Sequence, residues 1–204
     1  MSKIGLIDYG MGNIHSVKKA IEDLDEDVLL ITSKLQISSC KALIIPGQGA
    51  FDPAIDNLNR TGLIDEINKW IRSGKSFMGI CLGLQILFEE SEEGNKRGIG
   101  IIKGKIKKIP TIKNQRIPHI GWCKLIPSKD SKLLFKEEIN KWVYFDHSYF
   151  ASPNNENFVT ASVEYGPIHL TAIIEKENLI ACQFHPEKSG NIGQSLLSRW
   201  LKTI

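Results

Sequence analysis

The chain lacks several features that would assign it to a class at once. No apolar run approaches the roughly 18 residues that a membrane span requires. The N-terminus has no signal-peptide core, because Asp8 and Gly10 interrupt it. The few cysteines are far apart and form no C-x-x-C pair, which argues against a disulfide framework and a zinc ribbon: Cys40, Cys81, Cys123 and Cys182. We therefore expect a cytoplasmic protein with reduced thiols and no membrane partner.

An excess of charge is also missing. The 26 basic and 23 acidic residues give a formal net charge of +3, which is too slight to indicate a nucleic-acid partner. The lysines between Lys103 and Lys108 alternate with isoleucines, a pattern typical of a strand with one solvated face. Neither Gly10-Met11-Gly12 nor Gly47-Gln48-Gly49 continues into a complete dinucleotide-binding motif. We expect no cofactor and no metal.

What the sequence does contain is a regular alternation in its first half. Short apolar runs alternate with segments of helical period, one of them capped by Asn13 and another ending near Gly74. This pattern predicts a parallel sheet flanked by helices. The predicted strands are 4–7, 28–31, 42–45 and 77–78, and the predicted helices begin near residues 14, 63 and 82, the last running to Phe88.

The second half is rich in consecutive strand-like runs. They cover residues 101–109, 142–145, 158–163, 170–174 and 179–184, and a final helix contains Leu196 and Trp200. At 204 residues with 42% hydrophobic residues, the chain is long enough for one well-buried core. We predict a single α/β domain over residues 1–204 whose sheet becomes mixed or antiparallel in its second half.

Residues 79–83 (GICLG) are the most informative segment. They join a predicted strand to a predicted helix, so Cys81 occupies a sharp corner. Glycines two positions before and after Cys81 relieve the crowding of such a turn. At a helix N-terminus the backbone N–H groups lower a thiol's pKa and can stabilise an oxyanion. Cys81 is therefore a candidate nucleophile.

About one hundred residues later the chain contains His185-Pro186-Glu187. Side chains two apart on an extended segment point the same way, so Glu187 can orient the imidazole of His185 toward Cys81. Pro46-Gly47-Gln48-Gly49 follows another strand end and can supply backbone N–H groups to a reacting carbonyl. A lone cysteine is more often a small buried apolar residue, and we interpret Cys40, Cys123 and Cys182 that way.

The combined motifs resemble the class I (triad) glutamine amidotransferases, and most closely the glutaminase subunits of imidazole glycerol phosphate synthases. Where relatives serving anthranilate, carbamoyl phosphate or GMP synthesis typically carry His, this chain has Leu84. The resemblance implies a flavodoxin-like class I amidotransferase fold. Its segments extend over nearly the entire chain: 8–13, 46–51, 79–85, 118–122, 144–149 and 183–190.

The resemblance also implies roles. Cys81 attacks the glutamine amide to form a thioester and release ammonia, with His185 passing the proton and Glu187 holding it. Residues of the oxyanion hole, which is thought to reorient in this subfamily, are Gly47, Gln48, Gly49 and Leu82. Residues that bind glutamine are Gln85, Glu93, Ser148 and Tyr149, and those at the interface with a barrel-fold cyclase subunit are Asn13, Trp122 and Tyr144.

Three positions depart from the family pattern. Cys123 stands where Asn is usual, Asp146 where an apolar residue is common, and Gln48 where Val is common. Alternative functions are a paralogous glutaminase that feeds another acceptor, such as a sugar, and a catalytically weak regulatory or binding module. A peptidase-like cysteine hydrolase on a similar fold is disfavoured by the His-Pro-Glu segment.

Overall fold

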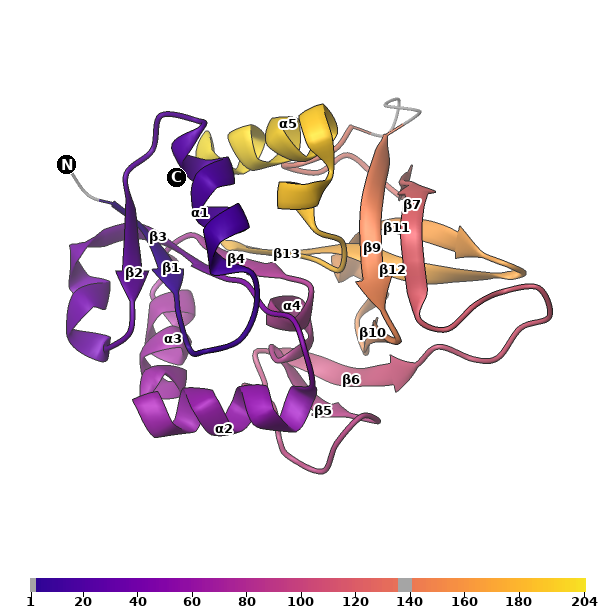
Figure 1. Ribbon diagram of the computed structural model, residues 1–204, viewed down its shortest axis with the longest axis horizontal. Helices are drawn as coiled ribbons and strands as arrows, with labels where there is room; N and C mark the ends of the chain where they lie inside the picture. Colours follow the sequence, from indigo (N-terminus) through magenta and orange to yellow (C-terminus); the bar gives the residue numbers. More distant parts are fainter. Residues whose placement is uncertain (1–2, 136–140) are drawn as a thin grey trace.

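A large mixed sheet forms the centre of the protein (Figure 1). The structure is a computed structural model, which describes residues 3–135 and 141–204. In these residues the sheet order is β2-β1-β3-β4-β13-β12-β11-β8. Strands from β2 to β13 pair in parallel, and from β13 to β8 they pair antiparallel, which confirms the predicted change. The strands are β1 (Lys3–Ile7), β2 (Val28–Ile31), β3 (Cys40–Ile45), β4 (Phe77–Ile80), β8 (Ile126–Pro127), β11 (Val159–Tyr165), β12 (Ile168–Lys176) and β13 (Leu179–Cys182).

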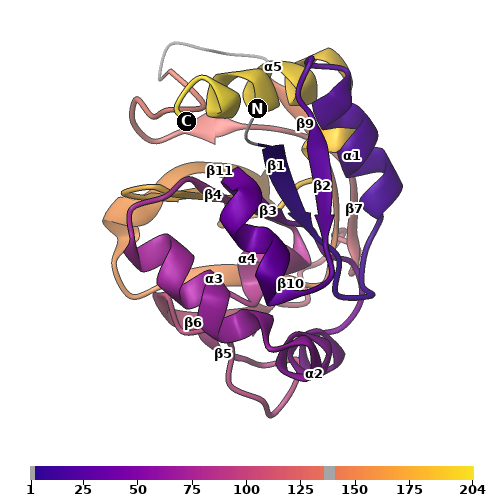
Figure 2. The ribbon, with the colours of Figure 1, turned by 90° about the vertical axis from the view of Figure 1, so that its left-hand side faces the viewer.

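Helices cover both faces of the parallel part. Figure 2 shows α1 (Ile14–Glu22) and α5 (Gly190–Leu201) on one side of the sheet and α2 (Phe51–Thr61) and α3 (Leu63–Arg72) on the other. Successive strand residues alternate between the two cores: Ile44 packs with α1 and α5, and Leu43 packs with α2 and α3. A central strand buried on both faces needs this continuous apolar sequence.

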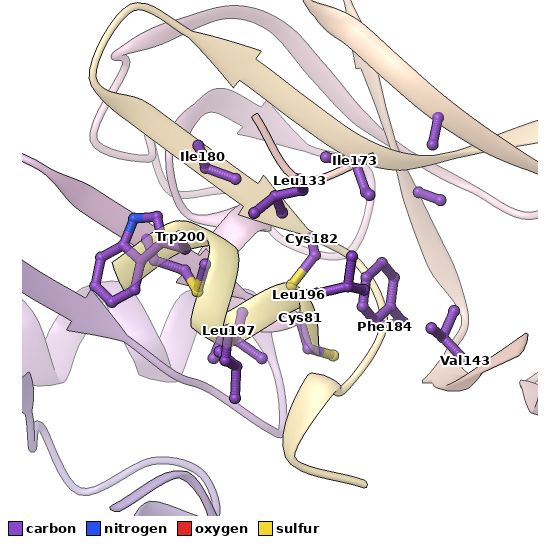
Figure 3. Close-up of a cluster of buried hydrophobic side chains, with 14 of the residues drawn as sticks. Cys81, Leu133, Val143, Ile173, Ile180, Cys182, Phe184, Leu196, Leu197 and Trp200 are labelled. Atoms are coloured by element: carbon purple, nitrogen blue, oxygen red, sulfur yellow. The ribbon is translucent and has the colours of Figure 1, made fainter. Parts of the chain in front are cut away.

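The core under α5 lies directly beneath the cysteine corner. Figure 3 shows Leu196, Leu197 and Trp200 of α5 packed beside Cys81 and Cys182. Trp200 is fully buried. Close-packed interiors resist displacement, so this cluster holds the corner in a fixed position.

Two smaller sheets extend the molecule beyond the central one. An antiparallel ribbon pairs β7 (His119–Lys124) with β9 (Trp142–His147), and the two strands lie side by side in Figure 1. A second small sheet has the order β10-β6-β5 among the described residues. Its strands are β5 (Phe88–Ser91), β6 (Ile102–Lys108) and β10 (Tyr149–Pro153), and the short 3₁₀ helices are η1 (Lys34–Ser39), η2 (Glu156–Phe158) and η3 (Pro186–Lys188).

The helix predicted from Leu82 to Phe88 was too long. Helix α4 spans only Leu82–Gln85, and Phe88 already begins strand β5, which pairs with Ile102. Residues Ile86, Leu87 and Phe88 are all fully buried. An apolar run buried on every side has no periodicity that could distinguish helix from strand.

Candidate active site

Cys81 occupies the strained corner between β4 and α4. Its backbone has φ 53° and ψ −109°, a conformation that a residue with a side chain rarely adopts. A Cβ on Gly79 would lie 2.8 Å from the carbonyl oxygen of Gly83, and a Cβ on Gly83 would lie 1.9 Å from that of Ile45. Only glycine fits at these two positions, so the corner has the form that the sequence predicted.

Cys81 is 5% exposed, and its sulfur lies near two polar atoms besides the His185 ring. Gln183 Nε2 lies 3.7 Å from the sulfur, and the carbonyl oxygen of Asp146 lies 4.0 Å from it. The peptide N–H of Cys81 donates to the carbonyl of Cys182 on the neighbouring strand at 2.8 Å. The backbone of Cys81 is therefore held by a short hydrogen bond, whereas the contacts of its sulfur with Gln183 and Asp146 are long and weak.

His185 and Glu187 form a buried pair. His185 Nδ1 lies 2.7 Å from Glu187 Oε1, and the two side chains are 3% and 1% exposed. The backbone N–H of His185 donates to the backbone carbonyl of Tyr144 at 2.9 Å, and η3 begins immediately after His185. The carboxylate therefore fixes the orientation of the ring, as a triad requires.

The neighbours of His185 favour the protonated form of its imidazole. Burial alone lowers its pKa, but the interactions with Cys81 and Glu187 outweigh burial and raise the pKa to about 10. Its Nε2 atom is buried and makes no well-aligned hydrogen bond within residues 3–135 and 141–204. Cys81 raises the pKa of His185 first as a hydrogen-bonding partner and then through its charge, so the two side chains interact directly.

A pocket of about 320 Å³ opens in front of Cys81. It brings together the candidate nucleophile, three of the four predicted oxyanion residues and all four predicted glutamine-binding residues. The lining consists of Gln48, Gly49, Cys81, Leu82, Gln85, Glu93, Pro118, Asp146, His147, Ser148 and Tyr149.

The fourth oxyanion residue, Gly47, lies against α4. The backbone N–H of Leu82 donates to its carbonyl at 3.4 Å. A Cβ on Gly47 would lie 2.4 Å from the hydroxyl of Tyr9, which donates to the carbonyl of Pro46 at 2.9 Å. Gly49 has φ +115°, a conformation that favours glycine. In this state the Leu82 N–H is occupied, so it is not offered to a substrate oxyanion.

The glutamine-binding candidates are themselves held by hydrogen bonds. Gln85 Nε2 donates to the carbonyl of Tyr149 at 3.0 Å and to Gln183 Oε1 at 3.2 Å. Glu93 Oε2 accepts from the backbone N–H of Phe51 at 2.9 Å, at the start of α2. Burial raises the pKa of Glu93, opposed by the Phe51 hydrogen bond and assisted by the nearby Asp52. A cationic partner would stabilise the ionised form of such a partly buried carboxylate.

Two features of the site were missed from the sequence. Gln183 is fully buried and joins Gln85 to the Cys81 sulfur; its only signal was a polar residue at the end of an apolar strand. The second is a contact between two of the departures from the family pattern: Gln48 Nε2 donates to Asp146 Oδ2 at 3.4 Å, across 98 positions of sequence. A pair of this separation has no local sequence signal.

The predicted interface residues lie outside the pocket. Trp122 and Tyr144 are cross-strand neighbours on the β7–β9 ribbon, with ring centroids 6.0 Å apart. Asn13 is exposed and caps α1, where its side chain accepts from the N–H of Ser16 at 3.2 Å.

The chain is similar in sequence to known proteins. The sequence matches the family described as glutamine amidotransferase class-I over residues 5–203. It is 63% identical to a Prochlorococcus marinus subsp. pastoris protein named imidazole glycerol phosphate synthase subunit HisH, with 100% of both chains covered. A protein of the same name from Prochlorococcus marinus strain MIT 9312 is 61% identical, again with 100% of both chains covered.

Solved structures of low sequence identity share the fold. One, described as the crystal structure of glutamine amidotransferase, has a TM-score of 0.76 and 19% identity over 98% of this chain and 97% of that one. PurLQS from Thermotoga maritima has a TM-score of 0.74 and 19% identity over 100% and 99% of the two chains. The chain therefore belongs to the class-I glutamine amidotransferases and, within them, to the HisH subunits of imidazole glycerol phosphate synthase.

Proposed function

We propose that this protein hydrolyses glutamine to glutamate and ammonia at Cys81 and delivers the ammonia to a cyclase subunit. The cyclase forms imidazole glycerol phosphate and aminoimidazole carboxamide ribotide in histidine biosynthesis. The observation that carries the proposal is the strained Cys81 at the wall of a glutamine-sized pocket, with His185 held 2.7 Å from Glu187 behind it. The HisH name of the relatives supports the pathway.

The proposed chemistry follows from the placement of Cys81, His185 and Glu187. The Cys81 thiolate attacks the side-chain amide carbon of glutamine, and the carbonyl oxygen becomes an oxyanion. His185 then gives its proton to the departing nitrogen, so ammonia leaves and a glutamyl thioester remains. Neutral His185 next takes a proton from water, which attacks the thioester and releases glutamate. Glu187 stabilises the imidazolium each time it forms.

Substrate recognition uses both ends of the pocket. The Glu93 carboxylate pairs with the α-ammonium of glutamine, which compensates for the burial of the acid. The backbone of Ser148 and Tyr149 binds the α-carboxylate, and Gln85 lies between them and Cys81. An amino acid held at its charged ends presents its amide to the sulfur.

The cyclase partner, which we propose has a barrel fold, is assigned to the outer face of the β7–β9 ribbon. This face exposes large apolar side chains: Ile120, Trp122 and Trp142 are 58%, 51% and 49% exposed. A contiguous apolar patch with aromatic residues is typical of a protein interface. Asn13 and Tyr144 belong to the same proposed interface. Ammonia passes through the partner rather than through solvent, where it would be protonated.

The proposed unit is the whole chain, residues 1–204, acting as one glutaminase domain in the cytoplasm. All four cysteines are free, as a reducing compartment requires. No helix in the described part of the chain is long and apolar enough to cross a membrane.

The test is glutamate release by the isolated chain, then with the cyclase and its ligand. We expect strong stimulation by the liganded cyclase, and loss of activity in Cys81→Ala. Glutamate release that survives Cys81→Ala would overturn the assignment of the nucleophile. A glutaminase that binds the cyclase without being stimulated would instead favour a paralogue that serves another acceptor, and a chain without glutaminase activity under any condition would favour a binding module.

A further inference from the structure

A chain of hydrogen-bonded side chains leads from the pocket along the inner face of the β7–β9 ribbon. His119 and His147 are register partners on β7 and β9, and both are buried. His147 Nδ1 lies 2.8 Å from the carbonyl oxygen of Tyr149, and His147 Nε2 lies 3.1 Å from His119 Nδ1. His119 Nε2 in turn lies 3.0 Å from the sulfur of Cys123. Cys123 is therefore half-buried with a specific partner, and the sequence-based interpretation of it as a plain apolar residue was wrong.

The hydrogen-bonding capacity of each group sets the direction of this chain. A carbonyl only accepts, so Nδ1 of His147 carries a hydrogen. Burial lowers the pKa of His147 to about 3, so the ring is neutral and its Nε2 accepts. His119 must then donate from Nδ1. Burial lowers the pKa of His119 as well, so its Nε2 accepts from the Cys123 thiol.

At the pocket end the chain meets the glutamine site. The carbonyl of Tyr149 accepts from both His147 Nδ1 and Gln85 Nε2. His147, Ser148 and Tyr149 all line the pocket. The Tyr149 carbonyl, next to the Ser148 and Tyr149 backbone that is proposed to bind glutamine, is thus held by two donors, one of which is the last member of the chain.

At the other end the chain reaches a second cavity. Cys123 lines a hollow of about 350 Å³ together with Trp122 and Trp142. These tryptophans are two of the exposed apolar residues of the proposed partner surface. The hydrogen-bonded chain therefore connects that surface to the wall of the pocket through one strand pair.

We propose that His147 and His119, with Cys123 as the terminal donor, are positioning residues that fix the Tyr149 peptide for glutamine binding. The inference rests on the proposed glutaminase function. All three side chains act through the Tyr149 carbonyl and none touches the reacting amide. Without the Cys123 donor, the ring hydrogen of His119 can occupy either nitrogen. The hydrogen bond from His119 to His147 then weakens, and the Tyr149 peptide becomes more mobile.

The experiment compares Cys123→Ala, which removes the donor, with Cys123→Ser, which keeps one. Each full-length variant is assayed with the liganded cyclase for glutamate release as a function of glutamine concentration. We expect Cys123→Ala to raise KM for glutamine about threefold with kcat unchanged, the scale of one neutral hydrogen bond. Cys123→Ser should restore KM. Cys40→Ala, at a cysteine on β3, is the matched control and should leave KM unchanged.

A spectroscopic readout separates this role from a merely structural one. The ¹⁵N chemical shifts of the histidine rings should show His119 and His147 as pure Nδ1–H tautomers in the wild type. In Cys123→Ala the His119 signal should shift toward a mixture. An unchanged KM together with an unchanged His119 tautomer in Cys123→Ala would overturn the proposal. A wild-type chain that releases no glutamate would instead contradict the proposed function, and the ¹⁵N spectra would still test the hydrogen-bonded chain.

Discussion

The backbone N–H of Leu82 donates a hydrogen bond to the carbonyl oxygen of Gly47, with 3.4 Å between nitrogen and oxygen. The donor at the start of α4 is thus occupied by the strand that should complete the oxyanion hole. At this length the bond is weak. Rotation of the Gly47–Gln48 peptide would break it, and glycine at positions 47 and 49 permits such a rotation.

The first prediction concerns the size of activation. A working oxyanion hole needs a free Leu82 N–H, which here is bonded to the Gly47 carbonyl. The isolated chain should therefore release glutamate slowly. The liganded cyclase should raise kcat about 10²-fold or more, the usual effect of one oxyanion donor. Steady-state kinetics with and without the partner measure this ratio. A full rate in the isolated chain would mean that the Gly47 carbonyl does not limit catalysis.

The second prediction concerns the contact between Gln48 and Asp146. This hydrogen bond ties the oxyanion strand to the end of β9 in the state where Leu82 is occupied. Gln48→Val removes the tie, so the glutaminase rate without partner should rise about threefold, the scale of one hydrogen bond. Gln48→Glu, which places two carboxylates together, should raise the rate at least as much. Lower rates in both variants would show that Gln48 supports the active state instead.

The third prediction is a pair of histidine titrations. NMR should find His185 protonated up to about pH 10 and His147 neutral down to about pH 3. His185 has a folded pKa above its ordinary 6.5, so its contribution to stability is complete below pH 6.5 and is lost as the pH rises through about 10. His147 has the opposite sign: its contribution is present above pH 6.5 and is lost as the pH falls toward about 3. Glu187→Gln should lower the His185 pKa, and an unchanged value would argue against the carboxylate as its partner.

The fourth prediction tests the corner glycines. A Cβ at Gly83 would lie 1.9 Å from the carbonyl oxygen of Ile45, so Gly83→Ala should cost about 3 kcal/mol or more in the free energy of unfolding. Gly62 is the control, because its φ is +67° but a Cβ there meets nothing within 4 Å. Gly62→Ala should cost only about 1 kcal/mol. Urea unfolding of the two variants compares the costs, and equal values would refute the steric argument.

The sequence predicted the candidate triad because each member sits beside a local signal. Cys81 lies between paired glycines, and His185 and Glu187 follow an apolar strand two positions apart. It also predicted the change from parallel to antiparallel pairing, because strand spacing differs between the two halves.

Long-range side-chain contacts were beyond the sequence. Gln48 and Asp146, or His119 and His147 across the β7–β9 ribbon, meet only once strand register is fixed. Helix α4 was overestimated for a related reason, since burial on all sides removes periodicity. These features depend on where the fold places each residue, which residue type alone does not predict.

The carboxylate of Glu93 has one further consequence. It accepts a hydrogen bond from the backbone N–H of Phe51, two residues after Gly49, so the proposed glutamine-binding carboxylate is tied to the segment that continues the proposed oxyanion strand. We expect a glutamine ammonium that pairs with Glu93 to change the strength of this hydrogen bond and so to affect the position of the segment. Glutamine binding and partner binding are then thermodynamically linked. A partner that moves the strand must change the affinity for glutamine, and glutamine must change the affinity for the partner by the same factor.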